Sequence, residues 1–158
     1  MQDLIVQNAD HILTMDDQRL ELRGADIRIR GGKIIELGQN LAVKNEDELV
    51  DARGCVITPG LVNTHHHLYQ TLTRAVPKAQ NALLFGWLQT LYPIWCNLGP
   101  NHIYWSNALA MAELALSGCT TSSDHLYLYP NGARLDDSFA AAADIGMRFH
   151  GTRGSMSI

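Results

Sequence analysis

The sequence lacks the features that mark membrane-spanning, secreted and nucleic-acid-binding proteins. It contains no unbroken apolar run near the ~20 residues that a bilayer-spanning helix needs. Its first residues, MQDLIVQNADHIL, have neither a basic start nor a long apolar stretch, so we expect no secretory signal. Lysine and arginine are not clustered and the formal net charge is -4, which disfavours a nucleic-acid partner. We therefore expect a cytoplasmic protein with no membrane partner and no nucleic-acid partner.

Cysteine is scarce as well. The three cysteines, Cys55, Cys96 and Cys119, are far apart in the sequence and form no C-x-x-C pair. Disulfide frameworks need paired cysteines and thiolate zinc sites need closely spaced ones, so the sequence predicts neither. We interpret the three residues as small buried apolar side chains in a reducing compartment.

Apolar residues, in contrast, make up 46% of the 158 residues, enough for the core of one ordinary domain. Residues 1–57 have the pattern of a small β-domain, and their clearest feature is a hairpin in residues 25–38 that turns at Gly31-Gly32. Two short strands are expected before the hairpin. The acidic segment 40–49 after it is expected to be a solvated loop, followed by a return strand.

From about residue 58 onward the pattern alternates between strands and helices. The segments expected as strands are 61–67, 119–127 and 147–154, and those expected as helices are 81–92, 101–118 and 135–146. Pro93 is predicted to end the first helix, and Gly118 and Gly146 are predicted to end the other two. Alternating strands and helices are typical of a parallel sheet with crossover helices, so the predicted fold class is α/β.

Three consecutive histidines, His65, His66 and His67, stand at the end of the first of these strands. Side chains two positions apart in a strand share a face, so His65 and His67 are expected to point together and His66 to point away. Two imidazoles placed in this way can bind one metal ion, and imidazole nitrogen suits zinc and also iron. The alternative is a pair of surface histidines. Against it, the end of a parallel strand is where barrel enzymes carry their active sites.

The stretch VITPGLVNTHHHLYQTLTR, the Trp-Leu pair in LFGWLQTLYPIW and the Gly-Cys-Thr-Thr segment come in an order that resembles the amidohydrolase superfamily. Within it, the chain is most similar to the aminohydrolase branch of guanine deaminases and triazine hydrolases. The resemblance implies that residues 58–158 are the first three βα units of a (β/α)8 TIM barrel and that residues 1–57 are part of a small β-sandwich domain. A complete barrel takes roughly 250 residues, so we expect the chain to be the leading segment of a longer one.

The resemblance implies a metal-dependent hydrolytic deaminase. One divalent ion, zinc or alternatively iron, is expected on His65 and His67, where it lowers the pKa of a water molecule from about 16 towards about 7. The reaction would replace an exocyclic amino group of a purine-like ring with oxygen, and 8-oxoguanine, giving urate and ammonia, is the preferred substrate. Guanine, triazines and other heterocycles are alternatives, as is a non-catalytic remnant module. The general acid and base are expected beyond Ile158, and self-association into a homo-oligomer is left open.

Six side chains are candidates for contacts with such a small heterocyclic substrate: Gln70, Trp87, Tyr69, Trp95, His125 and Arg153. In the resembled branch a glutamine three residues after the second metal histidine contacts the purine, and Gln70 has that offset. Trp87 could stack on a heteroaromatic ring, and Arg153 could direct a fork of donors at a carbonyl. The alternative for each of the six is a structural role, as a solvent-facing glutamine, a core residue or an ion-paired arginine.

Overall fold

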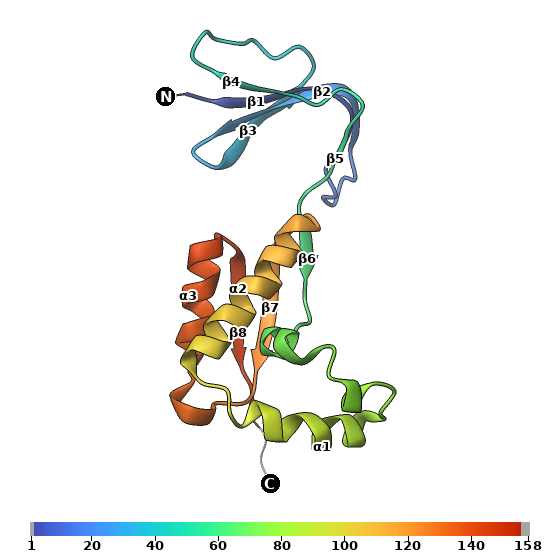
Figure 1. Ribbon diagram of the computed structural model, residues 1–158. Coiled ribbons are helices and arrows are strands. Elements are labelled where there is room, and N and C mark those ends of the chain that lie inside the picture. Colours follow the sequence, from blue (N-terminus) through green and yellow to red (C-terminus); the bar gives the residue numbers. More distant parts are fainter. Residues whose placement is uncertain (1, 156–158) are drawn as a thin grey trace. The chain divides into compact units, whose positions relative to one another are not determined.

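The computed structural model describes residues 2–155, and the chain divides into two compact units, residues 1–59 and residues 60–158. In the described part of the first unit every regular element is a strand, whereas the second unit combines parallel strands with helices (Figure 1). The α/β class predicted from the sequence is therefore confirmed.

The first unit is a mixed sheet. Its strands are β1 (Leu4–Leu13), β2 (Glu21–Arg30), β3 (Lys33–Gly38), β4 (Glu48–Asp51) and β5 (Val56–Ile57). They lie in the order β3-β2-β1-β4, and β5 also pairs with β1. β2 is antiparallel to β1 and to β3, whereas β4 and β5 are parallel to β1. The buried side chains that hold this unit together are Ala9, Ile12, Ala25, Ile27 and Ala52.

The hairpin predicted at Gly31-Gly32 is confirmed as the β2–β3 connection. Arg30 pairs with Lys33, and the two glycines between them have φ values of 56° and 74°. Positive φ at both central positions is what a type I′ turn requires, and glycine meets it without a Cβ clash.

The two short strands expected before the hairpin are in fact one strand, β1, with a bulge. Its register against β2 shifts between Val6 and Ala9, where Asn8 has a φ of 61°. Asparagine adopts this left-handed conformation more readily than most residues. The Asn8 N–H donates to Asp26 Oδ1 at 2.8 Å, so the bulge leaves this donor satisfied. The prediction of two short strands was wrong, because β1 continues through the bulge as a single strand.

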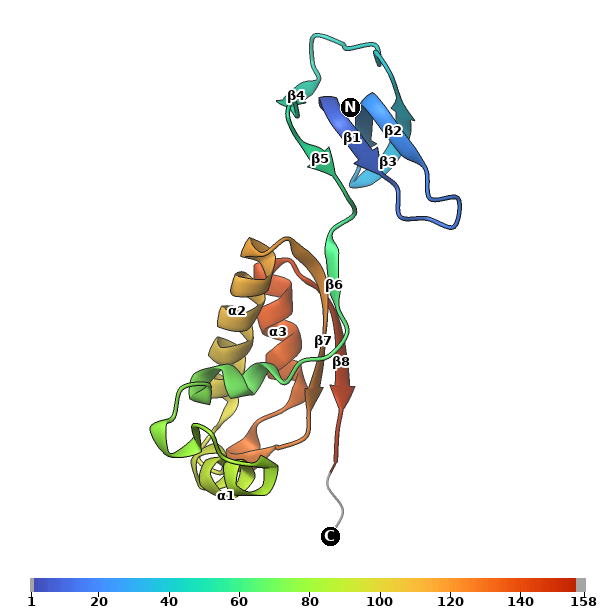
Figure 2. The same ribbon diagram turned by 90° about the vertical axis from the view of Figure 1, so that its right-hand side faces the viewer.

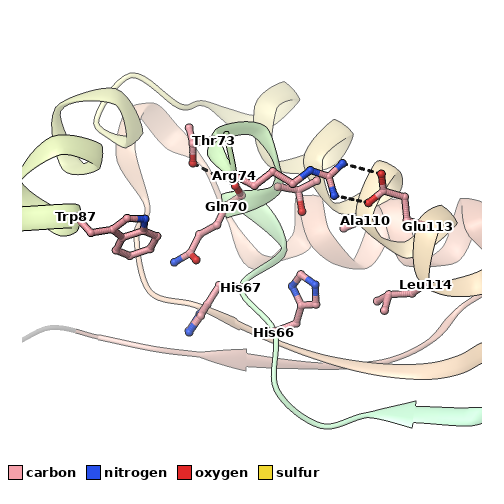
Figure 3. Close-up of a pocket in the computed structure, with 10 residues that line it drawn as sticks. His66, His67, Gln70, Thr73, Arg74, Trp87, Ala110, Glu113 and Leu114 are labelled. Atoms are coloured by element: carbon pink, nitrogen blue, oxygen red, sulfur yellow. Dashed lines mark hydrogen bonds and ion pairs between the residues drawn. The ribbon is translucent and has the colours of Figure 1, made fainter. Parts of the chain in front are cut away.

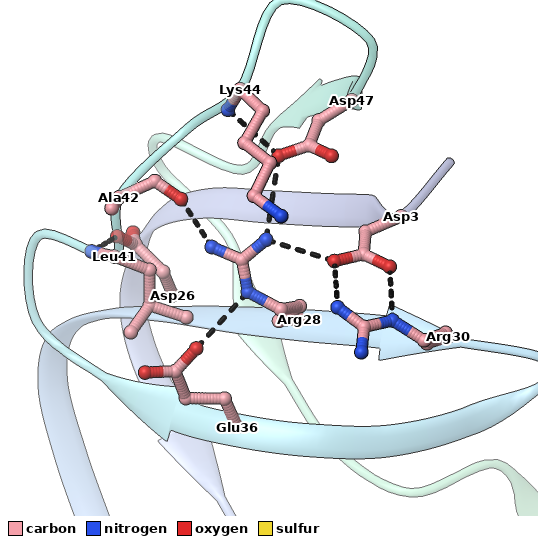
Figure 4. A network of polar contacts seen from close by, with 9 residues as sticks. All are labelled: Asp3, Asp26, Arg28, Arg30, Glu36, Leu41, Ala42, Lys44 and Asp47. Atoms are coloured by element: carbon pink, nitrogen blue, oxygen red, sulfur yellow. Dashed lines mark hydrogen bonds and ion pairs between the residues drawn. The ribbon is translucent and has the colours of Figure 1, made fainter. Parts of the chain in front are cut away.

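An ion-pair network joins β2, β3 and the acidic loop of the first unit (Figure 4). Arg28 Nη1 lies 3.0 Å from Asp3 Oδ2 and 3.3 Å from Asp47 Oδ2. Arg28 Nε lies 3.0 Å from Glu36 Oε2, and Arg30 Nε lies 2.6 Å from Asp3 Oδ1. The Asp47 side chain is 1% exposed, so the prediction of a solvated acidic loop was wrong at this residue. Its pairing with Arg28 is long-range, and no local sequence pattern reveals it.

The variant Asp3→Asn is expected to lower the Tm by several degrees at neutral pH. Hydrogen bonds from Arg30 and Arg28 hold the pKa of Asp3 well below its usual value near 3.8. Because folding lowers this pKa, the pairing stabilises the fold above about pH 4 and loses this effect as the pH falls further. Thermal unfolding from neutral pH to about pH 3 should therefore show the Tm difference between variant and wild type narrowing with acid.

The matched control is Asp51→Asn. Asp51 pairs with Arg53, but the two side chains are 48% and 78% exposed, so solvent screens the pair. This variant should change the Tm little, and a loss equal to that of Asp3→Asn would contradict the role given to the network.

The second unit contains three parallel strands in the sequential order β6-β7-β8. Its elements are β6 (Leu61–Asn63), β7 (Cys119–Leu126), β8 (Arg148–Arg153), α1 (Leu84–Trp95), α2 (Pro100–Leu116), α3 (Leu135–Ile145) and the short 3-10 helices η1 (Leu68–Thr73), η2 (Pro77–Ala79) and η3 (Pro130–Gly132). The crossover helices α2 and α3 cover one face of the sheet, and α1 lies at the end toward which the strands run (Figure 2). Within residues 2–155, no helix has the length and apolar character needed to cross a membrane.

The helix ends predicted at the two glycines are confirmed, whereas the end predicted at the proline is not. Gly118 follows α2 with a φ of 86°, and Gly146 follows α3 with a φ of 77°, as expected of left-handed residues that close a helix. The prediction that Pro93 ends the first helix was wrong, because α1 continues through Pro93 to Trp95. Pro93 lies in the last turn, where the missing N–H removes a single backbone hydrogen bond and the fixed φ is already helical.

Strand β6 is shorter than the strand predicted for residues 61–67, because it ends at Asn63. Asn63 Oδ1 accepts the backbone N–H of His65 at 3.2 Å. This contact forms an Asx turn, which asparagine favours. At this turn the chain leaves the backbone hydrogen-bond ladder of the sheet. The three histidines therefore lie in a loop after β6 rather than in the strand itself.

The cysteines follow the prediction in part. All three are free, so no disulfide forms among the described residues. Cys119 is buried as expected, whereas Cys55 and Cys96 are exposed.

Candidate metal and substrate site

The histidine loop is tied to the end of β7 by three hydrogen bonds. The His125 N–H donates to the carbonyl oxygen of His66 at 2.9 Å, and the Leu68 N–H donates to Asp124 Oδ1 at 2.8 Å. His67 Nδ1 lies 2.8 Å from the carbonyl oxygen of His125. Two consecutive residues of β7 thus hold the loop: Asp124 through its side chain and His125 through its backbone.

The same contact fixes the tautomer of His67. A carbonyl oxygen can only accept, so Nδ1 carries the hydrogen, and in the neutral ring Nε2 is then the nitrogen with the free lone pair. An imidazole in this state, oriented by a hydrogen bond through its other nitrogen, is the usual form of a histidine metal ligand. The rings of His65 and His67 lie 5.3 Å apart, edge to face. This donor pair fits a divalent ion.

The pair is not a complete ligand set. Among residues 2–155, no three side chains of histidine, cysteine, aspartate or glutamate lie close enough to share one ion. A zinc ion in a protein takes four ligands, of which His65 and His67 would supply two.

His66 is not part of the ring contact between His65 and His67. Its ring lines a cavity beside Ala110 and Leu114 of α2 (Figure 3). Burial lowers the pKa of His66, which favours the neutral ring, and its Nδ1 has no partner in the described part of the chain. The structure thus places His66 beside α2.

Asp124 is a fully buried carboxylate in β7, at 0% exposure. Its Oδ1 accepts the Leu68 N–H, while Oδ2 is buried and has no hydrogen-bond partner among the described residues. Burial raises the pKa of Asp124 above its usual value. Burying a carboxyl group costs free energy, and here one of its oxygens holds the backbone N–H directly after His67.

Two cavities, of about 480 Å³ and about 470 Å³, open beside the loop. His67, Gln70 and Trp87 line both of them. Figure 3 shows these three side chains toward one end of the first cavity, with His66 and Glu113 toward the other. The sequence candidates His67, Gln70 and Trp87 are therefore brought together on a common wall.

The Gln70 amide is held by two tyrosines. Its Nε2 donates to Tyr69 Oη at 3.3 Å and to Tyr127 Oη at 3.2 Å. Tyr127 also packs edge-on against His67, with ring centroids 5.3 Å apart. Tyr127 thus contacts both the Gln70 amide and His67, the candidate metal ligand.

Tyr69 and Trp95 line neither of these two cavities. Both are 0% exposed and belong to the main core cluster, where their rings lie 5.2 Å apart. Trp95 Nε1 donates to Thr73 Oγ1 at 2.9 Å, which satisfies the indole inside the core. Their prediction as substrate contacts is corrected to a structural role, because tertiary packing covers them completely.

His125 and Arg153 differ in their placement. His125 is exposed, lines the second cavity and lies 5.4 Å from the ring of His67. Arg153 is exposed as well, but its guanidinium stacks over the ring of Tyr129 at 5.2 Å and lines neither cavity. Only His125 is therefore near the other site residues.

Sequence reasoning missed Tyr127 and Asp124. Both could have been found from the alternation of β7, in which Ser122, Asp124 and Leu126 are buried in turn. A carboxylate on the buried face of a strand requires a partner. Tyr127 comes directly after β7 and two residues after His125. If the alternation continues to this residue, both side chains lie on the same, less buried face.

Residues 56–158 match the amidohydrolase family. The chain belongs to this family. The resemblance inferred from the motif around the three histidines is thereby confirmed.

Relatives within the amidohydrolase family include hydrolases of purines and of triazines. The chain is 47% identical to the 8-oxoguanine deaminase of Pseudomonas aeruginosa over 135 residues, which cover 82% of this chain and 30% of the relative. It is 37% identical to the hydroxydechloroatrazine ethylaminohydrolase of a Pseudomonas species, over 93% of this chain and 34% of the relative. An atrazine chlorohydrolase of Arthrobacter aurescens, complexed with zinc, superposes with a TM-score of 0.90 at 31% identity over 98% of this chain and 36% of that one. The chain thus spans about a third of the length of these relatives.

Proposed function

We propose that this amidohydrolase-family chain is the leading part of a metal-dependent hydrolytic deaminase. Its preferred substrate is 8-oxoguanine, whose exocyclic amino group is replaced by oxygen from water to give urate and ammonia. The observation that carries the proposal is the common wall of His67, Gln70 and Trp87 beside His65. The identity of 47% to an 8-oxoguanine deaminase supports the substrate.

His65 and His67 would hold the divalent ion, zinc or alternatively iron. When bound, such an ion makes water more acidic, with a pKa near about 7, and so makes a nucleophile available at neutral pH. The hydrogen bond from His67 Nδ1 to His125 keeps the other ring nitrogen free as a ligand. The zinc-complexed relative supports the choice of a divalent ion.

Trp87 and Gln70 would bind the ring of the substrate. Trp87 is half-buried and lines both cavities, so one face of its indole is available for stacking. Gln70 would hydrogen-bond to the edge of the ring through the amide group that the two tyrosines hold. Stacking fixes the plane of the ring, and the amide fixes its rotation within that plane.

The fold in this proposal is a partial barrel. The parallel strands β6, β7 and β8 would be the first three strands of a (β/α)8 barrel, and the first unit would be part of a β-sandwich domain. The sequential parallel order of the strands and the crossover helices α2 and α3 support this arrangement. The histidine loop and His125 then lie at the carboxyl ends of the strands, where barrels carry their active sites.

The test is ammonia release by the protein expressed from the complete reading frame and loaded with zinc. Turnover of 8-oxoguanine is expected, and Gln70→Ala should lower kcat/KM about tenfold or more, because a lost hydrogen bond leaves a substrate group unpaired. The matched control is Gln89→Ala, which removes an exposed glutamine of α1 away from the cavities. Turnover of a triazine without release of ammonia from any aminopurine would replace the substrate with the alternative that the triazine-acting relatives favour.

A further inference from the structure

Gly154 is the residue that directly follows β8, at the point where the ends of β7 and β8 run side by side. It is buried, and its N–H donates to the carbonyl oxygen of Leu126 at 2.7 Å. Just before it, the Thr152 hydroxyl donates to the carbonyl oxygen of Asp124. The backbone at Gly154 is therefore fastened to β7 and has little freedom to move away from it.

The space beside Gly154 is occupied by two other side chains. A Cβ atom added to Gly154 would lie 2.5 Å from His125 Nε2 and 2.7 Å from the Cβ atom of Tyr127. Non-bonded heavy atoms attract each other best at about 3.5–4.0 Å, so both contacts would be strongly repulsive. Gly154 does not have a positive φ, so its φ is open to other residues. Glycine is thus required here for space rather than for its backbone conformation.

The two side chains for which Gly154 leaves room lie beside the candidate metal ligand His67. The ring centroids of His125 and Tyr127 are 5.4 Å and 5.3 Å from that of His67. The carbonyl oxygen of His125 also accepts the hydrogen bond from His67 Nδ1. The His125 ring can rotate away from a new side chain, but the Tyr127 Cβ atom can move only with the backbone at the end of β7. Because that backbone carries the His125 carbonyl group, a side chain at position 154 would disturb the support of His67.

We infer that Gly154 is a positioning residue of the site, which acts on His67 through His125 and Tyr127. It has no side chain with which to bind a metal or a substrate. The chain leads from Gly154 directly to Ser155, which lines the second cavity together with His125 and Tyr127. This inference rests on the proposed function, because it names a residue that keeps the proposed metal ligand in place.

The decisive variant is Gly154→Ala in the protein expressed from the complete reading frame. Its zinc Kd, measured by competition with a chelator, should rise about 10- to 100-fold, the range for groups that orient metal ligands. In the metal-free protein, the nitrogen NMR resonances of the His67 ring should show a smaller population of the Nδ1–H tautomer than in wild type, because the carbonyl acceptor has moved. This second readout needs neither metal nor turnover.

The matched control is Gly151→Ala, on the same strand. Its Cβ atom would lie 3.0 Å from side-chain atoms of Phe139 and Phe149 and 3.3 Å from Leu135, on the side of α3 rather than of the histidines. This variant should lower the Tm and leave both the zinc Kd and the His67 tautomer unchanged. A rise in its zinc Kd equal to that of the decisive variant would overturn the inference.

A double-mutant cycle tests the route of the effect. In a His125→Ala background the ring that meets the new Cβ atom is gone, so Gly154→Ala should raise the zinc Kd by a smaller factor than in wild type. Equal factors in both backgrounds, an unchanged zinc Kd and tautomer in Gly154→Ala, or loss of its fold would each overturn the inference. If the wild-type protein binds no zinc, it is the proposed function that fails, and the His67 tautomer in metal-free Gly154→Ala still decides the inference.

Discussion

Replacing His67 with alanine should abolish stoichiometric zinc binding and lower turnover by about 10³-fold or more. The loss is large because the ion supplies several kcal/mol of the barrier reduction, and each ~1.4 kcal/mol is a factor of ten. His67 is a sharper target than its neighbours because a hydrogen bond from Nδ1 to the His125 carbonyl already holds it in the ligand tautomer. Zinc content by elemental analysis and ammonia release would be measured on the same sample.

The adjacent His66 provides the matched control for this prediction. It is the same residue type in the same loop, but its ring lies against α2 rather than beside His65. The variant His66→Ala should retain its zinc. Loss of zinc in His66→Ala together with retention of zinc in His67→Ala would show that the assignment of the pair is off by one residue.

The variant Asp124→Ala is expected to weaken zinc binding about 10- to 100-fold, the range for groups that orient metal ligands. Its carboxylate holds the Leu68 N–H, directly after His67, from a fully buried position in β7. Without it the loop loses one of its three ties to the strand. A chelator competition gives the Kd for zinc, and hydrogen exchange at the Leu68 amide reports the loop without any need for activity.

The variant Asp124→Asn separates positioning from general destabilisation. It keeps an oxygen that can accept the Leu68 N–H, so the zinc Kd should change less than in Asp124→Ala, and protection of the Leu68 amide should persist. Equal effects of the two substitutions on the zinc Kd, with a normal Tm in both, would contradict a role through this hydrogen bond.

Local patterns predicted the elements of the second unit well. The strand predicted for residues 119–127 is β7, and the glycines at 118 and 146 follow α2 and α3 as predicted, because each of these features depends on a few neighbouring residues. The ring contact of His65 with His67 was expected from strand alternation, but these residues lie in the loop after Asn63, so the loop and not a strand produces it.

Long-range packing decided what local patterns could not. Tyr69 and Trp95 have the chemistry of ligand contacts, but they are buried against each other where η1 and α1 meet in the fold. The burial of Asp47 depends on Arg28, 19 residues away. Tyr127 contacts Gln70, 57 residues earlier in the chain. None of these pairings produces a periodic pattern in the sequence.

The central claim is that His65 and His67 are the metal pair of an amidohydrolase-family deaminase. The most direct test is an anomalous difference map at the zinc edge from crystals of the zinc-loaded protein. The account predicts one zinc peak with ring nitrogens of His65 and His67 both at about 2.0–2.1 Å, and with the ring of His66 against α2. A zinc ion held by His66, or one bound elsewhere while His65 and His67 hold none, would contradict it.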